Sequence, residues 1–302
     1  MSAAIELMRE AFSKLASREA INQPRRRLIL PSGSTLHYMA AGDGTYFGTK
    51  IYSTHPVHGA HFLFLLYRAE DARPLALFEA NHLGQIRTGA ASGLATALLA
   101  RPESAVLGII GSGFQALSQL QAVAAVRDLR EIRVWSRSAS KREGFARQCA
   151  EELGLSVQPV DSAEEAVRGV EILVTATNAK DPVLEADWVS PGTHINAMGS
   201  NHPGRRELPS ELIQRAGLIV VDNLEQSKME SGDLLLALDQ EDWNGGRIVE
   251  LKDLMSTTWS ADPHITIFKS NGLAIEDVTC AGYIYELALK YGIGQDLPIF
   301  QS

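Results

Sequence analysis

GIIGSGFQALSQL, residues 108–120, consists of an apolar run, a glycine turn and the start of a predicted helix. Within it, Gly111, Gly113 and Ala116 form the pattern G-x-G-x-x-A at the junction of strand and helix, the context that makes this pattern specific. The first glycine permits a tight turn, the second lets the backbone approach a pyrophosphate, and a small third residue allows close helix–strand packing. The stretch therefore predicts a dinucleotide site rather than an ordinary strand-to-helix turn, with Phe114 and Gln115 also at the cofactor.

The next predicted strand, IRVW, indicates which dinucleotide is bound. A site for NAD usually has an Asp or Glu about 20 residues after the turn, which accepts a hydrogen bond from the ribose 2′-hydroxyl. Here the strand is followed by Ser136, Arg137 and Ser138, with Lys141 and Arg142 behind them. Hydroxyl, guanidinium and ammonium groups suit a 2′-phosphate. The sequence favours NADP(H); NAD(H) stays the alternative, because an arginine at a strand end can simply be solvated.

Short apolar strands alternate with helices from Arg101 to the strand GLIVVDN, as expected of a parallel sheet buried on both faces. The first hundred residues instead combine a helix, Ala4 to Leu15, with β-rich runs separated by turn signals such as PSGS and AGDG. We therefore predict an α/β fold with a Rossmann-type, doubly wound parallel sheet, preceded by an α+β segment of antiparallel strands. A final helix, DVTCAGYIYELALKYG, either closes the middle domain or returns to the first.

The composition excludes several classes of protein. The chain has 302 residues, 45% of them hydrophobic, and a net charge of −8 with no basic stripe, which argues against nucleic acid and anionic membrane partners. Its apolar runs stop short of the roughly 20 residues that span a bilayer, and no export signal follows Met1, so we expect a cytoplasmic protein. Cys149 and Cys280 have neither CxxC spacing nor a His pattern, so neither a disulfide framework nor a zinc site is expected. A small-molecule function fits these properties best.

Five segments together resemble the ornithine cyclodeaminase and mu-crystallin family, which includes alanine dehydrogenases of archaeal type and imine reductases. They are IRTGAASGLATALLA (86–100), GIIGSGFQA, THINAMGSN (193–201), VVDNLEQSKMESGDLL and ITIFKSNGLAIEDV (265–278), and they cover nearly the whole chain. The resemblance implies a discontinuous α+β domain, residues 1–98 plus 274–302, that binds substrate and forms the contact of a homodimer. It implies a dinucleotide-binding Rossmann domain over residues 99–273.

The resemblance also implies roles for single residues. Lys50, in FGTKIYS, matches the active-site lysine that protonates or polarises the substrate, and Arg87 matches the arginine that binds its carboxylate. Arg26 matches a second carboxylate-binding position, although Arg25 or Arg27 could be the inward residue because side chains alternate along a strand. The remaining expected positions are Met39 and Thr88 in the pocket, and Thr175, Ala176, Thr177, Met198, Gly199, Asn271 and Gly272 at the cofactor.

The sequence departs from the family at two predicted catalytic positions. Asn201 stands where ornithine cyclodeaminase and the archaeal alanine dehydrogenase carry a proton-shuttling aspartate, and an amide cannot titrate. His37 occupies the position of another charged substrate-binding residue and could act as an acid beside Lys50. A metal site among His37 and the three histidines of STHPVHGAH is not expected, because no Cys or Glu lies at ligand spacing.

These observations predict an NAD(P)H-dependent reductase of a small 2-imino acid, cyclic or linear, or equivalently an amino-acid dehydrogenase working in reverse. Lys50, desolvated near two arginines, should have a lowered pKa that makes it an acid near neutral pH. One alternative is an ornithine cyclodeaminase with bound NAD+, against which Asn201 and the Ser-Arg-Ser strand end both count. The other is a mu-crystallin-like protein that binds the nucleotide without catalysis.

Overall fold

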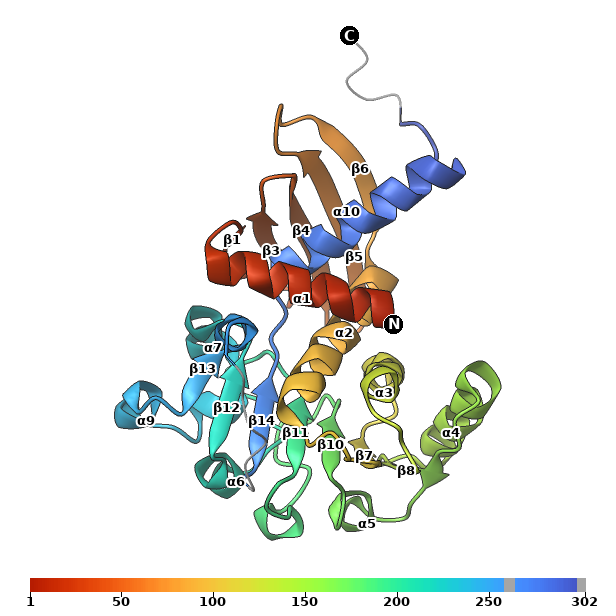
Figure 1. Ribbon diagram of the computed structural model, residues 1–302, viewed down its shortest axis with the longest axis vertical. Coiled ribbons are helices and arrows are strands. Elements are labelled where there is room, and N and C mark those ends of the chain that lie inside the picture. The colour runs from red at the N-terminus through yellow and green to blue at the C-terminus, as the bar shows by residue number, and fades with distance from the viewer. Residues whose placement is uncertain (258–263, 298–302) are drawn as a thin grey trace.

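The computed structural model describes residues 1–257 and 264–297, and two sheets organise it (Figure 1). The helices are α1 (Ser2–Ser17), α2 (Asn81–Leu99), α3 (Phe114–Val126), α4 (Ala139–Leu153), α5 (Ala163–Val167), η1 (Ala186–Trp188), α6 (Ser210–Arg215), α7 (Leu224–Glu230), α8 (Gly232–Leu235), α9 (Gln240–Asn244), η2 (Leu251–Met255) and α10 (Ala274–Tyr291). The strands are β1 (Ile21–Asn22), β2 (Arg26–Ile29), β3 (Thr35–Gly42), β4 (Tyr46–His55), β5 (Gly59–Arg68), β6 (Pro74–Glu79), β7 (Val106–Ile110), β8 (Glu131–Trp135), β9 (Gln158–Pro159), β10 (Ile172–Thr175), β11 (His194–Ala197), β12 (Leu218–Val221), β13 (Ile248–Glu250) and β14 (Thr266–Lys269).

The larger sheet is parallel, with strand order β13-β12-β14-β11-β10-β7-β8-β9. Its central strands β10, β11, β12 and β14 are buried at every residue. Helices α2, α3 and α4 lie on one face of the sheet, with α2 against β11 and β14, and α5 and α6 lie on the other (Figure 1). The chain order reverses between β7 and β10, which is the switch point where doubly wound sheets bind ligands. The predicted Rossmann-type fold is confirmed.

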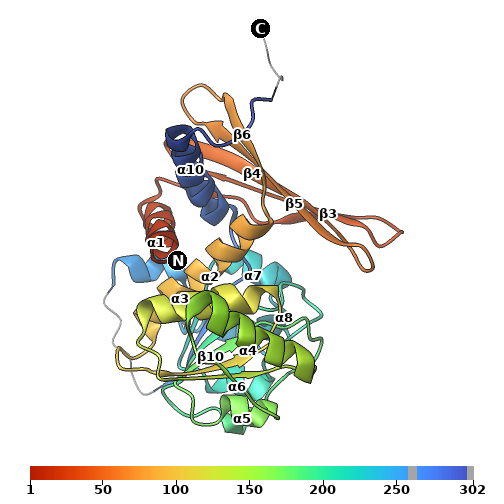
Figure 2. The ribbon, with the colours of Figure 1, turned by 90° about the vertical axis from the view of Figure 1, so that its right-hand side faces the viewer.

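The second sheet is antiparallel, in the order β1-β3-β4-β5-β6, with β2 paired to β3. One of its faces carries α10, which packs against β3, β4 and β5, while α1 packs against both α10 and α2 (Figure 2). The final helix therefore returns to the first part of the chain. Of the predicted boundary 274–302, residues 298–302 lie outside the described residues.

Helix α2 connects the two sheets, because it packs on α1 at one side and on α3 at the other. Its small residues permit this close packing: a Cβ at Gly89 would lie 2.4 Å from the carbonyl oxygen of Ser118 on α3. The hydrophobic core accordingly runs across both parts, from Phe12 and Phe64 to Phe268 of the parallel sheet. Arg87 is thus carried on an element that both parts hold in place.

Within residues 1–257 and 264–297, no helix has the length and apolar character needed to cross a membrane.

Candidate active site

The glycine turn between β7 and α3 has the shape that a dinucleotide requires. Gly111 has a φ of +109°, and a Cβ there would lie 2.3 Å from the carbonyl oxygen of Ala176, so the turn must pass close to the end of β10. A Cβ at Gly113 would meet no atom within 4 Å, which leaves space for a phosphate against the backbone. The first turn of α3 has neither a side-chain cap nor an acidic residue. These residues fit the pyrophosphate of a dinucleotide at the N-terminus of α3.

The end of β8 offers a cation that is not engaged elsewhere. Ser136 and Ser112 hydrogen-bond through their hydroxyls at 2.8 Å, and Ser138 caps α4. Arg142 is held by the carbonyl oxygen of Ser136 at 3.2 Å and by the Asp161 carboxylate at 2.8 Å. The exposed Arg137 makes no hydrogen bond or ion pair to any described residue. Its guanidinium is therefore available to an anionic ligand.

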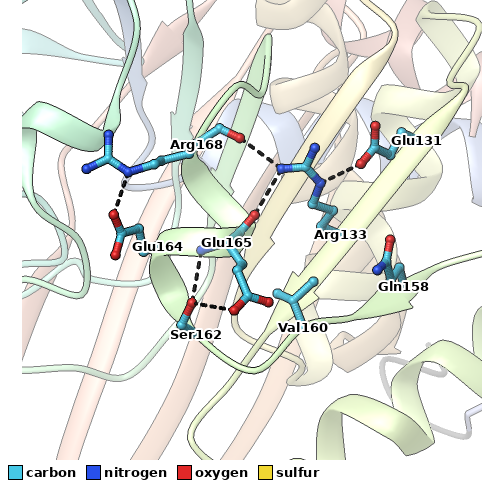
Figure 3. Close-up of a pocket in the computed structure, with 8 residues that line it drawn as sticks. All are labelled: Glu131, Arg133, Gln158, Val160, Ser162, Glu164, Glu165 and Arg168. Carbon is cyan, nitrogen blue, oxygen red and sulfur yellow. Dashed lines mark hydrogen bonds and ion pairs between the residues drawn. The ribbon is translucent and has the colours of Figure 1, made fainter.

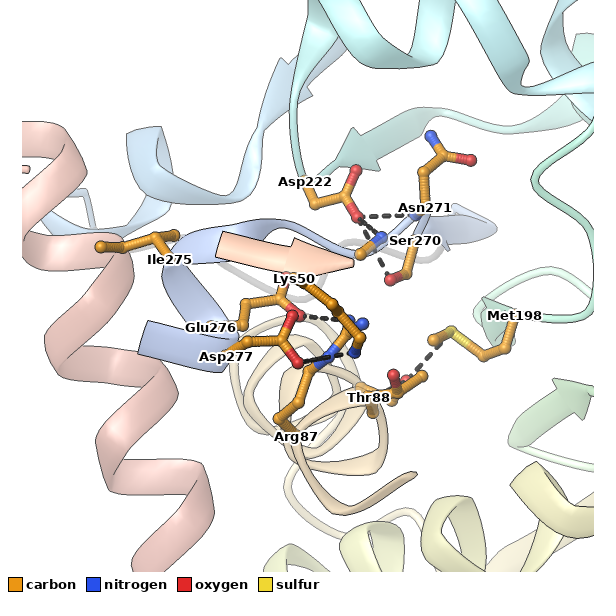
Figure 4. Close-up of polar contacts among 12 residues, drawn as sticks. Lys50, Arg87, Thr88, Met198, Asp222, Ser270, Asn271, Ile275, Glu276 and Asp277 are labelled. Carbon is orange, nitrogen blue, oxygen red and sulfur yellow. Dashed lines mark hydrogen bonds and ion pairs between the residues drawn. The ribbon is translucent and has the colours of Figure 1, made fainter. Parts of the chain in front are cut away.

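Lys50, Arg87 and two carboxylates form a buried ionic cluster where β4, α2 and α10 meet (Figure 4). Lys50 Nζ donates to Asp277 Oδ1 at 2.7 Å, and Arg87 Nε donates to the same oxygen at 3.3 Å. The Arg87 NH1 group donates to Glu276 Oε2 at 2.7 Å. Both acids lie in the first turn of α10 and are fully buried. The structure thus brings together the two predicted cations and adds two acids that the prediction did not include.

Burial shifts the proton affinities in this cluster toward neutral pH. Burial lowers the pKa of Lys50 to about 8; Asp277 opposes this effect, and the Arg87 and Arg25 cations add to it. Burial raises the pKa of Glu276 to about 7 against the opposing charge of Arg87. Because both groups exchange protons near neutrality, Lys50 can act as an acid or a base under ordinary conditions.

Several polar atoms of this region have no partner in the described residues. Asp277 Oδ2 and Glu276 Oε1 are buried acceptors without a hydrogen bond, and so is Asn271 Oδ1. Buried polar atoms are nearly always satisfied, so these atoms indicate a site that a polar ligand or water completes. The second terminal nitrogen of Arg87 makes no hydrogen bond to the described residues, which leaves it available to a carboxylate.

Arg25 is the buried member of the Arg-Arg-Arg run, and the expectation for Arg26 is corrected. In the antiparallel pairing of β2 with β3, Arg27 lies opposite His37 and Arg26 lies opposite Tyr38. Arg26 therefore points to the face of the sheet away from α10, and it is exposed. Arg25 pairs with Glu230 and donates to the carbonyl oxygen of Asn271 at 2.8 Å. Arg27, on the inner face, donates to Glu230 Oε2 at 2.5 Å and to the carbonyl oxygen of Asn201 at 3.0 Å.

His37 lies on the same face as Lys50, but its environment does not suit an acid. Its ring stacks on Tyr52 with centroids 4.3 Å apart, and Nε2 lies 2.9 Å from Thr54 Oγ1. Burial, with the nearby Arg27 and Arg25 cations, lowers the pKa of His37 to about 4. The ring is therefore neutral at pH 7, which argues against its predicted role as a proton donor.

Asp222 and Gly272 determine the backbone conformation of residues 271–272, which lie beside Arg87. The Asp222 carboxylate accepts hydrogen bonds from the backbone N–H groups of Asn271 and Gly272, both at 2.6 Å. Gly272 has a φ of +80°, and a Cβ there would lie 2.4 Å from Arg87 NH1. Only glycine therefore permits both this turn and the position of the Arg87 guanidinium.

The other predicted residues lie on the elements of the ionic cluster or at the ends of β10 and β11. Met39 pairs with Lys50 and is buried, Thr88 follows Arg87, and Met198 Sδ lies 3.1 Å from Ser92 Oγ. Thr175, Thr177 and Gly199 all hydrogen-bond to one buried carboxylate, Glu207. Asn201 is exposed, and its side chain makes no hydrogen bond to the described residues.

The prediction missed the acidic partners of its cations: Asp222, Glu230, Glu276 and Asp277. All four stand in quoted family segments, since Asp222 and Glu230 lie in VVDNLEQSKMESGDLL and the Glu-Asp pair lies at the end of ITIFKSNGLAIEDV. A pair of acids in the first turn of a strongly apolar helix is a signal for charge placed near its N-terminus. That signal was available in the sequence.

A separate groove of about 470 Å3 lies beside β8, β9 and α5 (Figure 3). Its guanidinium groups are already paired, Arg133 with Glu131 at 2.5 Å and Arg168 with Glu164 at 2.5 Å. It contains none of the predicted site residues. Among the described residues, no group of three or more His, Cys, Asp or Glu could hold a metal ion.

Comparison with known proteins places this geometry in context. The model of the ornithine cyclodeaminase/mu-crystallin family matches residues 1–292. Alanine dehydrogenase of Archaeoglobus fulgidus is 37% identical over 316 residues, covering 100% of this chain and 95% of that protein. Among solved structures, Thermococcus litoralis Delta(1)-pyrroline-2-carboxylate reductase in complex with NADH and L-proline has a TM-score of 0.91 at 34% identity, over 97% of this chain and 95% of that one. An archaeal alanine dehydrogenase dimer with bound NAD has a TM-score of 0.91 at 35% identity, over 99% and 95% of the two chains.

Proposed function

The chain belongs to the ornithine cyclodeaminase/mu-crystallin family, and we propose that it reduces a small 2-imino acid, cyclic or linear, with NAD(P)H, or runs the same reaction in reverse as an amino-acid dehydrogenase. It is an oxidoreductase that acts on C–N bonds. The observation that carries the proposal is the buried Lys50–Asp277–Arg87 cluster, which combines a proton donor with a pKa of about 8 and a guanidinium with a free nitrogen.

Arg87 and Lys50 have separate tasks in this proposal. Arg87 binds the substrate carboxylate through its free terminal nitrogen, while Glu276 and Asp277 fix the orientation of its guanidinium. Arg27, which is partly exposed on the inner face, is a better second cation for the carboxylate than Arg26. Reduced nicotinamide, when bound, would supply hydride to the imine carbon. Lys50 Nζ gives its proton to the imine nitrogen, so that the C=N bond becomes CH–NH and the lysine is left neutral.

Asp277 keeps Lys50 effective as that acid. Its carboxylate accepts from Nζ at 2.7 Å and raises the pKa of Lys50 against the lowering effect of burial. Without this acid, burial and the neighbouring arginines would lower the pKa of Lys50 further. His37, neutral and stacked on Tyr52, serves as a wall of the pocket.

The ornithine cyclodeaminase reaction is the runner-up. It requires a titratable group at the substrate amine, and Asn201 cannot provide one. The third candidate, nucleotide binding without catalysis, is opposed by the intact Lys50–Arg87 cluster. Incubation with NADPH and a panel of 2-imino acids, and separately with L-ornithine and NAD+, distinguishes all three: cofactor oxidation, formation of proline with ammonia, or neither.

We propose NADP(H) as the preferred cofactor. The support is the unengaged Arg137 between Ser136 and Ser138, at the strand end where an NAD site has an acid. The two solved relatives hold NAD or NADH, so the preference of this chain rests on its own residues. A 2′-phosphate would receive hydrogen bonds from Arg137 and from the serine hydroxyls.

We further propose a homodimer formed through the antiparallel sheet, within a domain of residues 1–98 plus the C-terminal helix. The face opposite α10 exposes a row of large apolar side chains on neighbouring strands, among them Leu28 (55%), Tyr38 (46%), Leu63 (47%) and Leu77 (47%). Contiguous apolar faces of this kind mark interfaces, and closed pairs are the commonest assemblies. The alanine dehydrogenase relative is a dimer. A cytoplasmic location stays a prediction of the sequence.

A further inference from the structure

Glu207 is a fully buried carboxylate that joins two loops of the parallel sheet. Its Oε1 accepts from the backbone N–H of Thr177 at 2.7 Å. Its Oε2 accepts from Thr175 Oγ1 at 2.9 Å and from the backbone N–H of Gly199 at 2.7 Å. Thr175 is the last residue of β10, Thr177 belongs to the loop that follows it, and Gly199 belongs to the loop after β11. One side chain therefore ties the two loops together.

The two loops are in direct contact at Gly199. A Cβ at Gly199 would lie 2.2 Å from the carbonyl oxygen of Thr177 and 2.3 Å from Glu207 Oε1. The backbone N–H of Met198 also donates to the carbonyl oxygen of Thr175 at 2.9 Å. No larger side chain fits between the loops at this point.

A buried ion pair holds Glu207 from the opposite side. Asp233 Oδ1 accepts from the backbone N–H of Glu207 at 2.7 Å, and Asp233 Oδ2 lies 3.0 Å from Lys269 Nζ. Lys269, fully buried at the end of β14, also donates to the carbonyl oxygen of Ser200 at 2.5 Å. The loop after β11 is therefore fixed by Glu207 on one side and by Lys269 on the other.

These two loops lie at the nicotinamide half of the proposed cofactor site. The pyrophosphate fits the turn after β7, and the adenosine ribose fits the end of β8, where the Ser136–Ser138 segment lies. The sheet continues from β7 through β10 to β11 on the other side of the switch point. The remaining half of a dinucleotide therefore reaches the ends of β10 and β11, which Glu207 joins.

We infer that Glu207 is a positioning residue that fixes the loops after β10 and β11 for the nicotinamide half of the cofactor. This inference rests on the proposed use of NAD(P)H. Glu207 acts through Thr175, Thr177 and Gly199. Its carboxylate is suited to the task because three donors converge on its two oxygens, and an amide has only one acceptor oxygen for them.

Ligand binding without turnover tests the inference. In Glu207→Gln an amide NH2 faces at least one N–H donor, so the two loops are no longer tied. We expect the dissociation constant of NADPH, measured by nicotinamide fluorescence, to rise about tenfold or more, as one charge-assisted hydrogen bond would give. ADP-ribose 2′-phosphate, which lacks the nicotinamide, should bind within about twofold of wild type by calorimetry. Hydrogen exchange of the Thr177 and Gly199 amides should become faster.

Two further variants complete the experiment. Glu211→Gln removes an exposed carboxylate on α6 that makes no hydrogen bond to the described residues. This variant should bind both ligands with wild-type affinity. Thr175→Val, which keeps the shape of the side chain and removes one donor to Glu207, should weaken NADPH selectively if Glu207→Gln fails to fold. An equal loss of affinity for both ligands in these variants, or no change in either affinity, overturns the inference. Because no substrate is present, these outcomes are independent of whether the chain reduces imines.

Discussion

Lys50 Nζ and Asp277 Oδ1 lie 2.7 Å apart although 227 positions of sequence separate them. The contact joins strand β4 to the first turn of the C-terminal helix, so it brings together segments from the two ends of the chain. It places a buried cation with a pKa of about 8 beside an arginine whose guanidinium is oriented by two carboxylates. The proposed chemistry depends on this pair.

Asp277→Asn should shift the pH dependence of imine reduction. Asp277 raises the pKa of Lys50, so its neutralisation should move that pKa from about 8 to a lower value. Reduction requires the protonated lysine and falls as the pH rises through this pKa, so the descending limb of kcat/KM should move to lower pH. The reverse, oxidative reaction requires neutral Lys50, and its ascending limb should move in the same direction. An unchanged limb would mean that Lys50 does not titrate in the reaction.

Lys50→Met should remove the proton donor while leaving the cofactor site intact. We expect kcat to fall by about 10² to 10⁴, the usual effect of losing a general acid. The dissociation constant of NADPH should stay within about twofold, because the glycine turn and Lys50 belong to different sheets. Steady-state kinetics and fluorescence titration measure the two effects. A variant that retains wild-type kcat would exclude Lys50 as the donor.

Gly272→Ala should displace Arg87. Its Cβ would lie 2.4 Å from Arg87 NH1, so the KM for the imino acid should rise on the order of tenfold or more through loss of substrate positioning. Gly246→Ala is the matched control: Gly246 has a φ of +79°, close to the +80° of Gly272, but a Cβ there meets no atom within 4 Å. The control carries the backbone strain alone. Equal effects of the two substitutions would argue against a role for the position of Arg87.

Arg137→Asp should change the cofactor preference. Loss of a charge-assisted contact to the 2′-phosphate should weaken NADP(H) by about 1.5 to 3 kcal/mol and should affect NAD(H) much less. Arg147→Asp, an exposed site on α4, makes the same change of charge and should affect neither cofactor. Titration of the wild type and of both variants with NADP(H) and with NAD(H) decides the question. The NADP(H) proposal is falsified if both cofactors weaken alike.

Leu63→Glu should convert a dimer into monomers. Leu63 is 47% exposed on the apolar outer face of the antiparallel sheet, and a buried, unpaired carboxylate at an interface is costly. Leu236→Glu, at a site that is 53% exposed in the Rossmann part, should leave the assembly unchanged. Light scattering at micromolar concentration gives the mass of each. A monomeric wild-type protein, or a Leu63→Glu variant that stays dimeric, would contradict an interface on this face.

Local patterns predicted much of the fold. The glycine turn fixed the strand–turn–helix unit because its φ and close contacts demand glycine, and the uninterrupted apolar strands indicated a sheet covered on both faces. The segment VELKDLM (249–255) has a helix-like pattern, but Val249 and Glu250 pair with β12 as the end of β13, and the remaining residues form the 3-10 helix η2. The return of α10 to the first sheet was an open alternative, since sequence periodicity does not identify the partner of a helix.

The site was less predictable than the fold. Resemblance supplied Lys50 and Arg87, but the phase of β2 depends on its pairing with β3, so Arg26 was chosen where Arg25 is the buried residue. The neutral state of His37 follows from burial beside Arg27 and Arg25, which spacing in the sequence does not reveal. Glu207 collects donors from two loops, and no local pattern marks that convergence.

The central claim is that this chain reduces a C=N bond and does not cyclise ornithine. The most direct measurement follows the absorbance of reduced nicotinamide while the protein is incubated with NADPH and small cyclic or linear 2-imino acids. A parallel incubation with L-ornithine and NAD+ is analysed for proline and ammonia. The account predicts oxidation of NADPH with at least one imino acid and no proline from ornithine. Formation of proline and ammonia, with no NADPH oxidation on any imino acid, would contradict it.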